Sequence, residues 1–152
     1  MVRLDRRWWL AIGVAVVVAV VVVLSNTVFD GPSEECKPVK DMLDFNNSQG
    51  ELIASKASDS DPAVPTVAED AVYQQWADGM AQRAQQVTDP NLAATAIQVA
   101  DATSQFVAKL PRMRSEAENR VPGAPAPRVW IEMTLLNQRI IEGLDELADA
   151  CS

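Results

Sequence analysis

Histidine is missing from the 152-residue sequence, and only two cysteines and few aromatic residues, 5% of the chain, are present. Without histidine, serine triads, Cys-His dyads and most zinc sites are excluded. The scarcity of aromatic residues, together with abundant alanine, leaves almost no strand signal outside the N-terminal block. The composition therefore favours a helical protein that catalyses no reaction.

Positive charge is also scarce, with 13 Lys and Arg residues against 21 Asp and Glu residues. Residues 1–29 contain three arginines and one aspartate, so the remaining 123 residues carry a net charge of −10. A domain this acidic repels phosphate backbones, which argues against nucleic-acid binding.

Candidate chemistry is weak in the sequence, and we predict no catalytic residue, no cofactor and no metal site. A haem site of the kind found in helical haem carriers would have only weak axial ligands in this chain, because histidine is missing. Several carboxylates could be paired for acid-base catalysis. They lie outside the regularly spaced apolar positions of the expected helices, so solvated helix faces explain them better. The carboxylates concerned are Asp41, Asp44, Glu142, Asp145 and Glu146, and the haem candidates are Tyr73, Met80, Met113 and Met133.

A long apolar run near the N-terminus predicts a transmembrane helix over residues 8–29. Its first 17 residues carry no charge, and the full 22 residues would span about 33 Å as a helix. That length matches a hydrocarbon core of about 30 Å. A cleaved signal peptide shares the basic start and the apolar run. The length of the run and the lack of an A-x-A-like site favour an uncleaved anchor.

The charges that flank this run predict its orientation in the plasma membrane. Arg3, Arg6 and Arg7 precede it, whereas Asp30, Glu34 and Glu35 follow it. Because positive charge is retained in the cytoplasm, residues 1–7 are expected inside the cell. Residues 30–35 would then form a juxtamembrane linker and residues 36–152 an extracytoplasmic, periplasmic domain.

A row of small residues lies within the predicted span, where Ala11, Ala15 and Ala19 recur every four residues. Such a face lets a second membrane helix approach closely, so the row is a candidate for helix packing. The alternative is ordinary alanine usage in a protein with 22 alanines.

Four helical segments are expected after the anchor, giving an all-α fold with a small antiparallel bundle of about four helices. Residues 33–55 form the first helix, interrupted at Asn46, Asn47 and Gly50, and a polar loop follows over residues 58–65. The capping pair Thr66 and Glu69 opens the second helix. Its apolar stripe comprises Tyr73, Trp76, Met80, Ala84 and Val87.

The third and fourth helices are marked more clearly. Asp89 and Pro90 begin the third, which Pro111 is expected to end or kink, with the charged residues 112–120 as an alternative prolongation. A proline-rich connector over residues 122–127 precedes the fourth helix. The apolar stripe of the third is Leu92, Ala96, Val99, Thr103, Phe106 and Leu110; that of the fourth is Trp130, Met133, Leu136, Ile140, Leu144, Leu147 and Cys151.

The two cysteines lie at opposite ends of this segment, and we predict a disulfide between Cys36 and Cys151. In an up-down bundle of four helices, the first helix begins at the end where the fourth finishes. Both residues would also lie on the oxidising side of the membrane. The alternatives are two free thiols or an intermolecular bond.

Nine arginines against four lysines, abundant alanine, a Val/Ala anchor and a disulfide-closed helical ectodomain resemble small single-pass envelope proteins of actinobacteria, including mycobacteria. The resemblance is architectural and transfers no functional residue. It implies an accessory subunit of a larger membrane assembly, such as an Mce-type lipid importer or a respiratory complex. The expected partners are therefore other integral membrane proteins and the lipid bilayer. The alternative is an extracytoplasmic helical module that binds a lipid or another apolar ligand.

Overall fold

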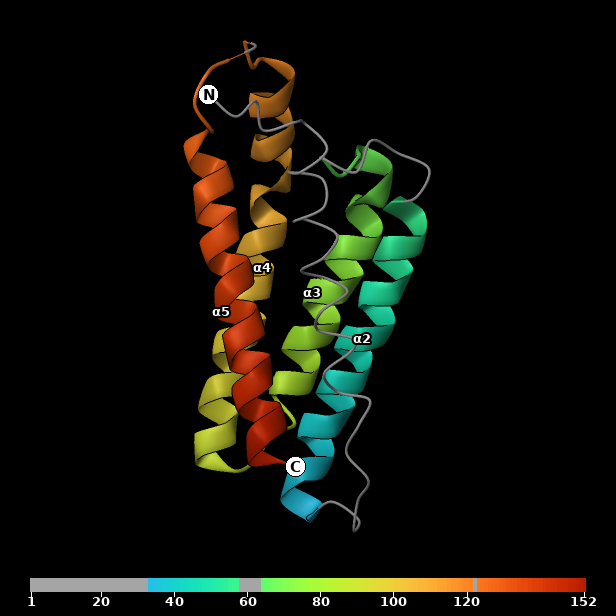
Figure 1. Ribbon diagram of the computed structural model, residues 1–152. Coiled ribbons are helices and arrows are strands. Elements are labelled where there is room, and N and C mark those ends of the chain that lie inside the picture. The colour runs from blue at the N-terminus through green and yellow to red at the C-terminus, as the bar shows by residue number, and fades with distance from the viewer. Residues whose placement is uncertain (1–32, 58–63, 122) are drawn as a thin grey trace.

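The computed structural model describes residues 33–57, 64–121 and 123–152, and every regular element in these ranges is helical. Successive long helices run antiparallel (Figure 1). The most extensive packing is between α4 and α5, while α2 and α5 contact each other over a short stretch. An all-α, up-down bundle of four helices is confirmed. The long helices are α2 (Lys37–Ala57), α3 (Asp70–Ala84), α4 (Pro90–Glu118) and α5 (Arg128–Ala150), and the 3-10 turns are η1 (Glu34–Cys36) and η2 (Val67–Glu69).

Helix α2 is continuous, so the expected interruption at Asn46, Asn47 and Gly50 is wrong. Contacts with α3 explain why weak helix formers are tolerated there. The Asn46 side chain accepts a hydrogen bond from the indole N–H of Trp76 at 3.0 Å. One residue earlier, the Phe45 ring covers Gly79, where an added Cβ would lie 2.1 Å from the ring Cζ. Tertiary contacts therefore override the local preference.

Helix α4 begins as predicted, because the Asp89 carboxylate accepts hydrogen bonds from the backbone N–H groups of Asn91 and Leu92. It does not end at Pro111 and continues to Glu118. Proline removes one N–H donor from the ladder, but its ring lies on the solvent side here. Met113, beyond the proline, is buried and holds the last turns of the helix against the bundle.

The apolar stripes predicted from the sequence form most of the core, which consists of two adjoining clusters. Within the predicted set, five residues are only partly buried: Tyr73, Trp76, Leu92, Phe106 and Trp130. Val87 is buried just beyond the end of α3. Trp76 and Phe106 pack against both clusters and join them. Their rings meet edge to face, with centroids 6.2 Å apart.

The predicted disulfide is confirmed, since Cys36 and Cys151 are bonded with their Cα atoms 5.5 Å apart. The bond lies at the end of the bundle where α2 begins and α5 finishes, the lower end in Figure 1. Both cysteines are buried. We call this the base of the bundle; the opposite end, with the α4–α5 connector, is the tip.

The predicted span over residues 8–29, with Ala11, Ala15 and Ala19, lies outside the described residues. So do the N-terminal residues 1–7, residues 30–32 of the predicted linker 30–35 and residues 58–63 of the predicted loop 58–65. Among the helices that are described, none combines the length and the apolar character needed to cross a membrane.

A candidate docking groove between α4 and α5

Gly143 of α5, which has no side chain, lets α4 and α5 approach closely near the base. An added Cβ at Gly143 of α5 would lie 2.4 Å from Cγ2 of Val99 on α4, far inside ordinary contact distance. Val99 is 1% exposed and β-branched, so it has little freedom to move aside. Glycine is therefore required here by a close helix-helix approach, in spite of its poor helix propensity.

An open groove runs along the outer side of this helix pair and has a volume of about 450 Å³. Small or apolar residues, namely Val99, Ala102, Leu136 and Gly143, belong to its lining. The polar lining from α4 consists of Thr95, Gln98, Asp101 and Gln105, and that from α5 of Arg139, Glu142 and Glu146. The groove thus combines a narrow apolar strip with polar walls.

Negative charge dominates the walls of this groove. The lining carries three carboxylates, Asp101, Glu142 and Glu146, against the single cation Arg139. The segments 88–108 and 140–152 contain no lysine or arginine. Glu142 accepts a hydrogen bond from the Gln138 amide at 2.8 Å, and Glu146 accepts one from the Thr95 hydroxyl at 3.3 Å. Both carboxylates remain exposed. They are thus available to a cationic group of another molecule.

Toward the tip, an ion pair joins the two helices beyond the groove. The Lys109 ammonium donates to Glu132 at 2.6 Å. This hydrogen bond, together with the charge of Lys109, lowers the pKa of the Glu132 carboxyl. On the same part of α5, Ile131 and Leu135 are 55% and 52% exposed. Two exposed apolar side chains thus lie on α5 between the groove and the tip.

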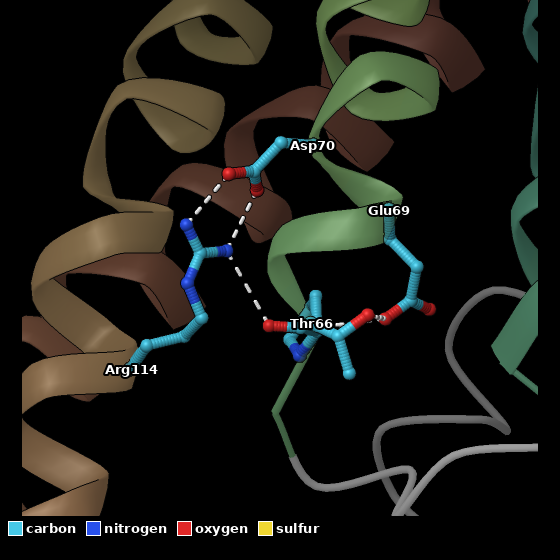
Figure 2. Close-up of polar contacts among 5 residues, drawn as sticks. Thr66, Glu69, Asp70 and Arg114 are labelled. Atoms are coloured by element: carbon cyan, nitrogen blue, oxygen red, sulfur yellow. Dashed lines mark hydrogen bonds and ion pairs between the residues drawn. The ribbon is translucent and has the colours of Figure 1, made fainter.

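A separate polar network joins α3 to the last turns of α4 (Figure 2). The Arg114 guanidinium donates two hydrogen bonds to the Asp70 carboxylate, at 2.6 and 2.7 Å, and a longer one to the Pro65 carbonyl oxygen. Beside it, Thr66 and Glu69 form the predicted capping box. The network fixes the start of α3 against α4 and so has a structural role.

Tyr73 lies one turn beyond this capping box, and burial raises the pKa of its phenol from 10.0 to about 12, with a smaller contribution from the charge of Glu69. The folded chain therefore keeps a proton that the unfolded chain releases between about pH 10 and 12. Stability should fall as the pH rises through this window, by up to about 1.4 kcal/mol per pH unit. Below pH 10 the phenol is neutral in both states and contributes no pH dependence.

Denaturant titrations of the protein and of Tyr73→Phe across pH 8–11.5 isolate this effect from lysine titration, which both proteins share. The variant should show the shallower alkaline decline. Parallel declines would contradict the raised pKa.

The structure brings some of the predicted residues together and separates others. Asp41 forms an ion pair with Arg83 at 3.0 Å, whereas Glu142 and Glu146 line the groove. The side chains weighed as haem ligands pack in the apolar clusters, Met80 in one and Met113 and Met133 in the other. In the described parts of the chain, no group of three or more His, Cys, Asp or Glu side chains could hold a metal ion.

The groove itself was not predicted from the sequence. Two signals point toward it in retrospect: the segments without lysine or arginine, and a glycine in the middle of the otherwise strongly amphipathic α5. Comparison with known proteins adds no further guide, because no protein-family model, no curated protein and no solved structure matches this chain.

Proposed function

We propose that this protein is a membrane-anchored, non-enzymatic accessory subunit of a larger cell-envelope membrane complex, of the kind that serves lipid transport or respiration. The observation that carries the proposal is the position of the disulfide. Cys36 follows the last residue of the proposed span, Phe29, by only seven residues, and its bond to Cys151 joins the start of the helical chain to its end at the base of the bundle. A base closed in this way next to an anchor would hold the helices at the membrane surface.

Such a subunit would project its bundle away from the plasma membrane on the extracytoplasmic side. The 23 residues of α5 correspond to about 35 Å of helix. A disulfide agrees with an oxidising compartment. The groove between α4 and α5 would then face neighbouring integral membrane proteins. It would meet the parts of those proteins that lie outside the membrane on the same side.

The character of the groove supports a protein partner over an apolar ligand. Sites for apolar small molecules are concave and lined mostly by apolar side chains. Here the hollow is open and its walls carry Asp101, Arg139, Glu142 and Glu146. Polar walls of this type suit a protein segment with matching polar groups.

The proposal predicts that the full chain, solubilised gently from its native membrane, migrates within a large assembly. Ala15→Leu should lower recovery of that assembly without preventing insertion, because bulk separates closely packed membrane helices while leaving the span apolar. Val17→Leu is the matched control, since residue 17 lies about 200° around the helix from residue 15. Native electrophoresis with mass spectrometry measures the outcome. A lone chain with a co-purified apolar molecule would instead establish the ligand-binding alternative.

A further inference from the structure

We infer that the α4–α5 groove binds an amphipathic helix of a partner protein that presents lysine or arginine side chains to the groove. This inference rests on the proposed function, because it identifies the chemistry of the partner segment. It is argued from the described residues: the shape of the groove, its charge and the two exposed apolar side chains of α5 that follow it toward the tip.

The shape fits a third helix laid along the pair α4 and α5. The lining extends along α5 from Leu136 to Glu146, a rise of about 15 Å, which is nearly three helical turns. Ala102 and Gly143 are the smallest residues of this lining, and the longer Arg139 stands between Leu136 and Gly143 on α5. Helix axes in contact lie about 8–10 Å apart, and small residues at the contact permit the shorter distances.

The charge of the groove selects a cationic occupant. Asp101 projects from α4, and Glu142 and Glu146 project from α5, against the single cation Arg139. Complementary charges across an interface direct binding and exclude unsuitable partners. Residues 30–152 carry a net charge of −10, so a second copy of this chain is repelled, and so is the surface of an anionic bilayer.

The apolar residues next to the groove determine the second property of the occupant. Ile131 and Leu135 are more than half exposed and lie one helical turn apart on α5. A segment that pairs with the carboxylates near the base would also cover these two side chains if it carried apolar residues at its other end. The expected occupant is therefore amphipathic, with cations at its base-facing end.

A defined probe tests the charge requirement directly. The full chain, reconstituted in nanodiscs of a zwitterionic lipid, is titrated with a fluorescent helix-forming peptide of about 18 residues. One face of the peptide carries lysines in one half and leucines in the other half, and the remaining positions are alanine and glutamine. Binding should weaken about tenfold in the triple variant Asp101→Asn, Glu142→Gln, Glu146→Gln, and should decline with added salt.

A matched control triple variant, Asp44→Asn, Glu51→Gln, Glu118→Gln, removes the same charge from exposed positions outside the groove. It should leave the affinity within about twofold of the parent protein. Equal weakening in both triple variants would show non-specific attraction to an acidic protein and would overturn the inference. Equal binding of a glutamate version of the peptide would overturn it too.

Crosslinking in the native membrane distinguishes failure of this inference from failure of the proposed function. Photoreactive residues replace Gln98 and Gln105 in the groove, and Gln75 on the exposed side of α3 serves as the control position. The expected product at the groove is a lysine- or arginine-bearing helical segment of another protein, lost in the groove triple variant.

Any other crosslinked product would contradict the inference, the proposed function or both. An acidic segment, or a second copy of this chain, would overturn the inference. Crosslinks at Gln75 alone, within an intact assembly, would overturn it and leave the proposed accessory role standing. A chain that migrates alone and crosslinks to no protein would overturn both.

Discussion

Replacing Cys36 and Cys151 together with alanine should lower the free energy of unfolding by about 2–5 kcal/mol. The bond closes a loop with 114 intervening residues, for which the chain-entropy model gives nearly 5 kcal/mol before native-state strain is subtracted. The bundle depends on the bond because α2 and α5 contact each other over only a short stretch. Without it, α2 is held chiefly by its packing on α3.

Thermal unfolding of the full chain in mild detergent, followed by circular dichroism at 222 nm, measures this loss. For a domain of this size, each kcal/mol corresponds to about 4–6 °C in Tm, so a decrease of at least about 8 °C is expected. Adding a reductant to the parent protein should reproduce the decrease, and the double alanine variant should not respond to it. An unchanged Tm on reduction would mean that helix packing alone holds α2 to α5.

Trp76→Ala should be the most destabilising single substitution at the α2–α3–α4 contact, with a loss of about 3 kcal/mol. Trp76 packs against both apolar clusters, meets Phe106 edge to face and donates a hydrogen bond to Asn46. Its removal leaves a space between three helices and an unpaired amide on α2. The side chain is partly exposed, which places the expected loss at the lower end of the range for a tryptophan.

Trp76→Phe separates the two contributions of this side chain. The variant keeps an aromatic ring for Phe106 and loses the N–H donor to Asn46, so a loss of about 1 kcal/mol is expected. Urea unfolding monitored by circular dichroism gives both values, and hydrogen exchange locates the opened helices. Equal losses for the alanine and phenylalanine variants would show that the hydrogen bond, not the packing, stabilises this contact.

The bundle is a linear series of helix pairs, and α2 is the long helix with the least packing against its neighbours. Helix α3 packs on α2 through Phe45 and Gly79 and on α4 through Trp76 and the Arg114–Asp70 pair. Helices α4 and α5 form the most extensive pair. The groove thus lies on the most extensive helix pair of the described chain, which favours binding of a partner without rearrangement.

The sequence alone determined the helical class, the number of long helices and the pairing of the cysteines. Apolar residues that recur at three and four positions predicted the buried faces of α3, α4 and α5. Thr66 with Glu69 predicted the capping box, which opens the 3-10 turn η2 that leads into α3, and Asp89 with Pro90 predicted where α4 begins. Both signals are local, because capping depends on residues close in the chain. The cysteine pairing followed from connectivity, since an even number of antiparallel helices returns the chain to its starting end.

Only the tertiary structure decided where weak local signals are overridden and which faces meet. Helix α2 continues through Asn46, Asn47 and Gly50 because α3 packs against it, and α4 passes Pro111 because later residues are anchored to the bundle. The groove depends on Gly143 facing Val99, two residues 44 positions apart. Periodicity shows that each helix has an apolar face, but it contains no information on the register between two helices, which side-chain packing alone determines.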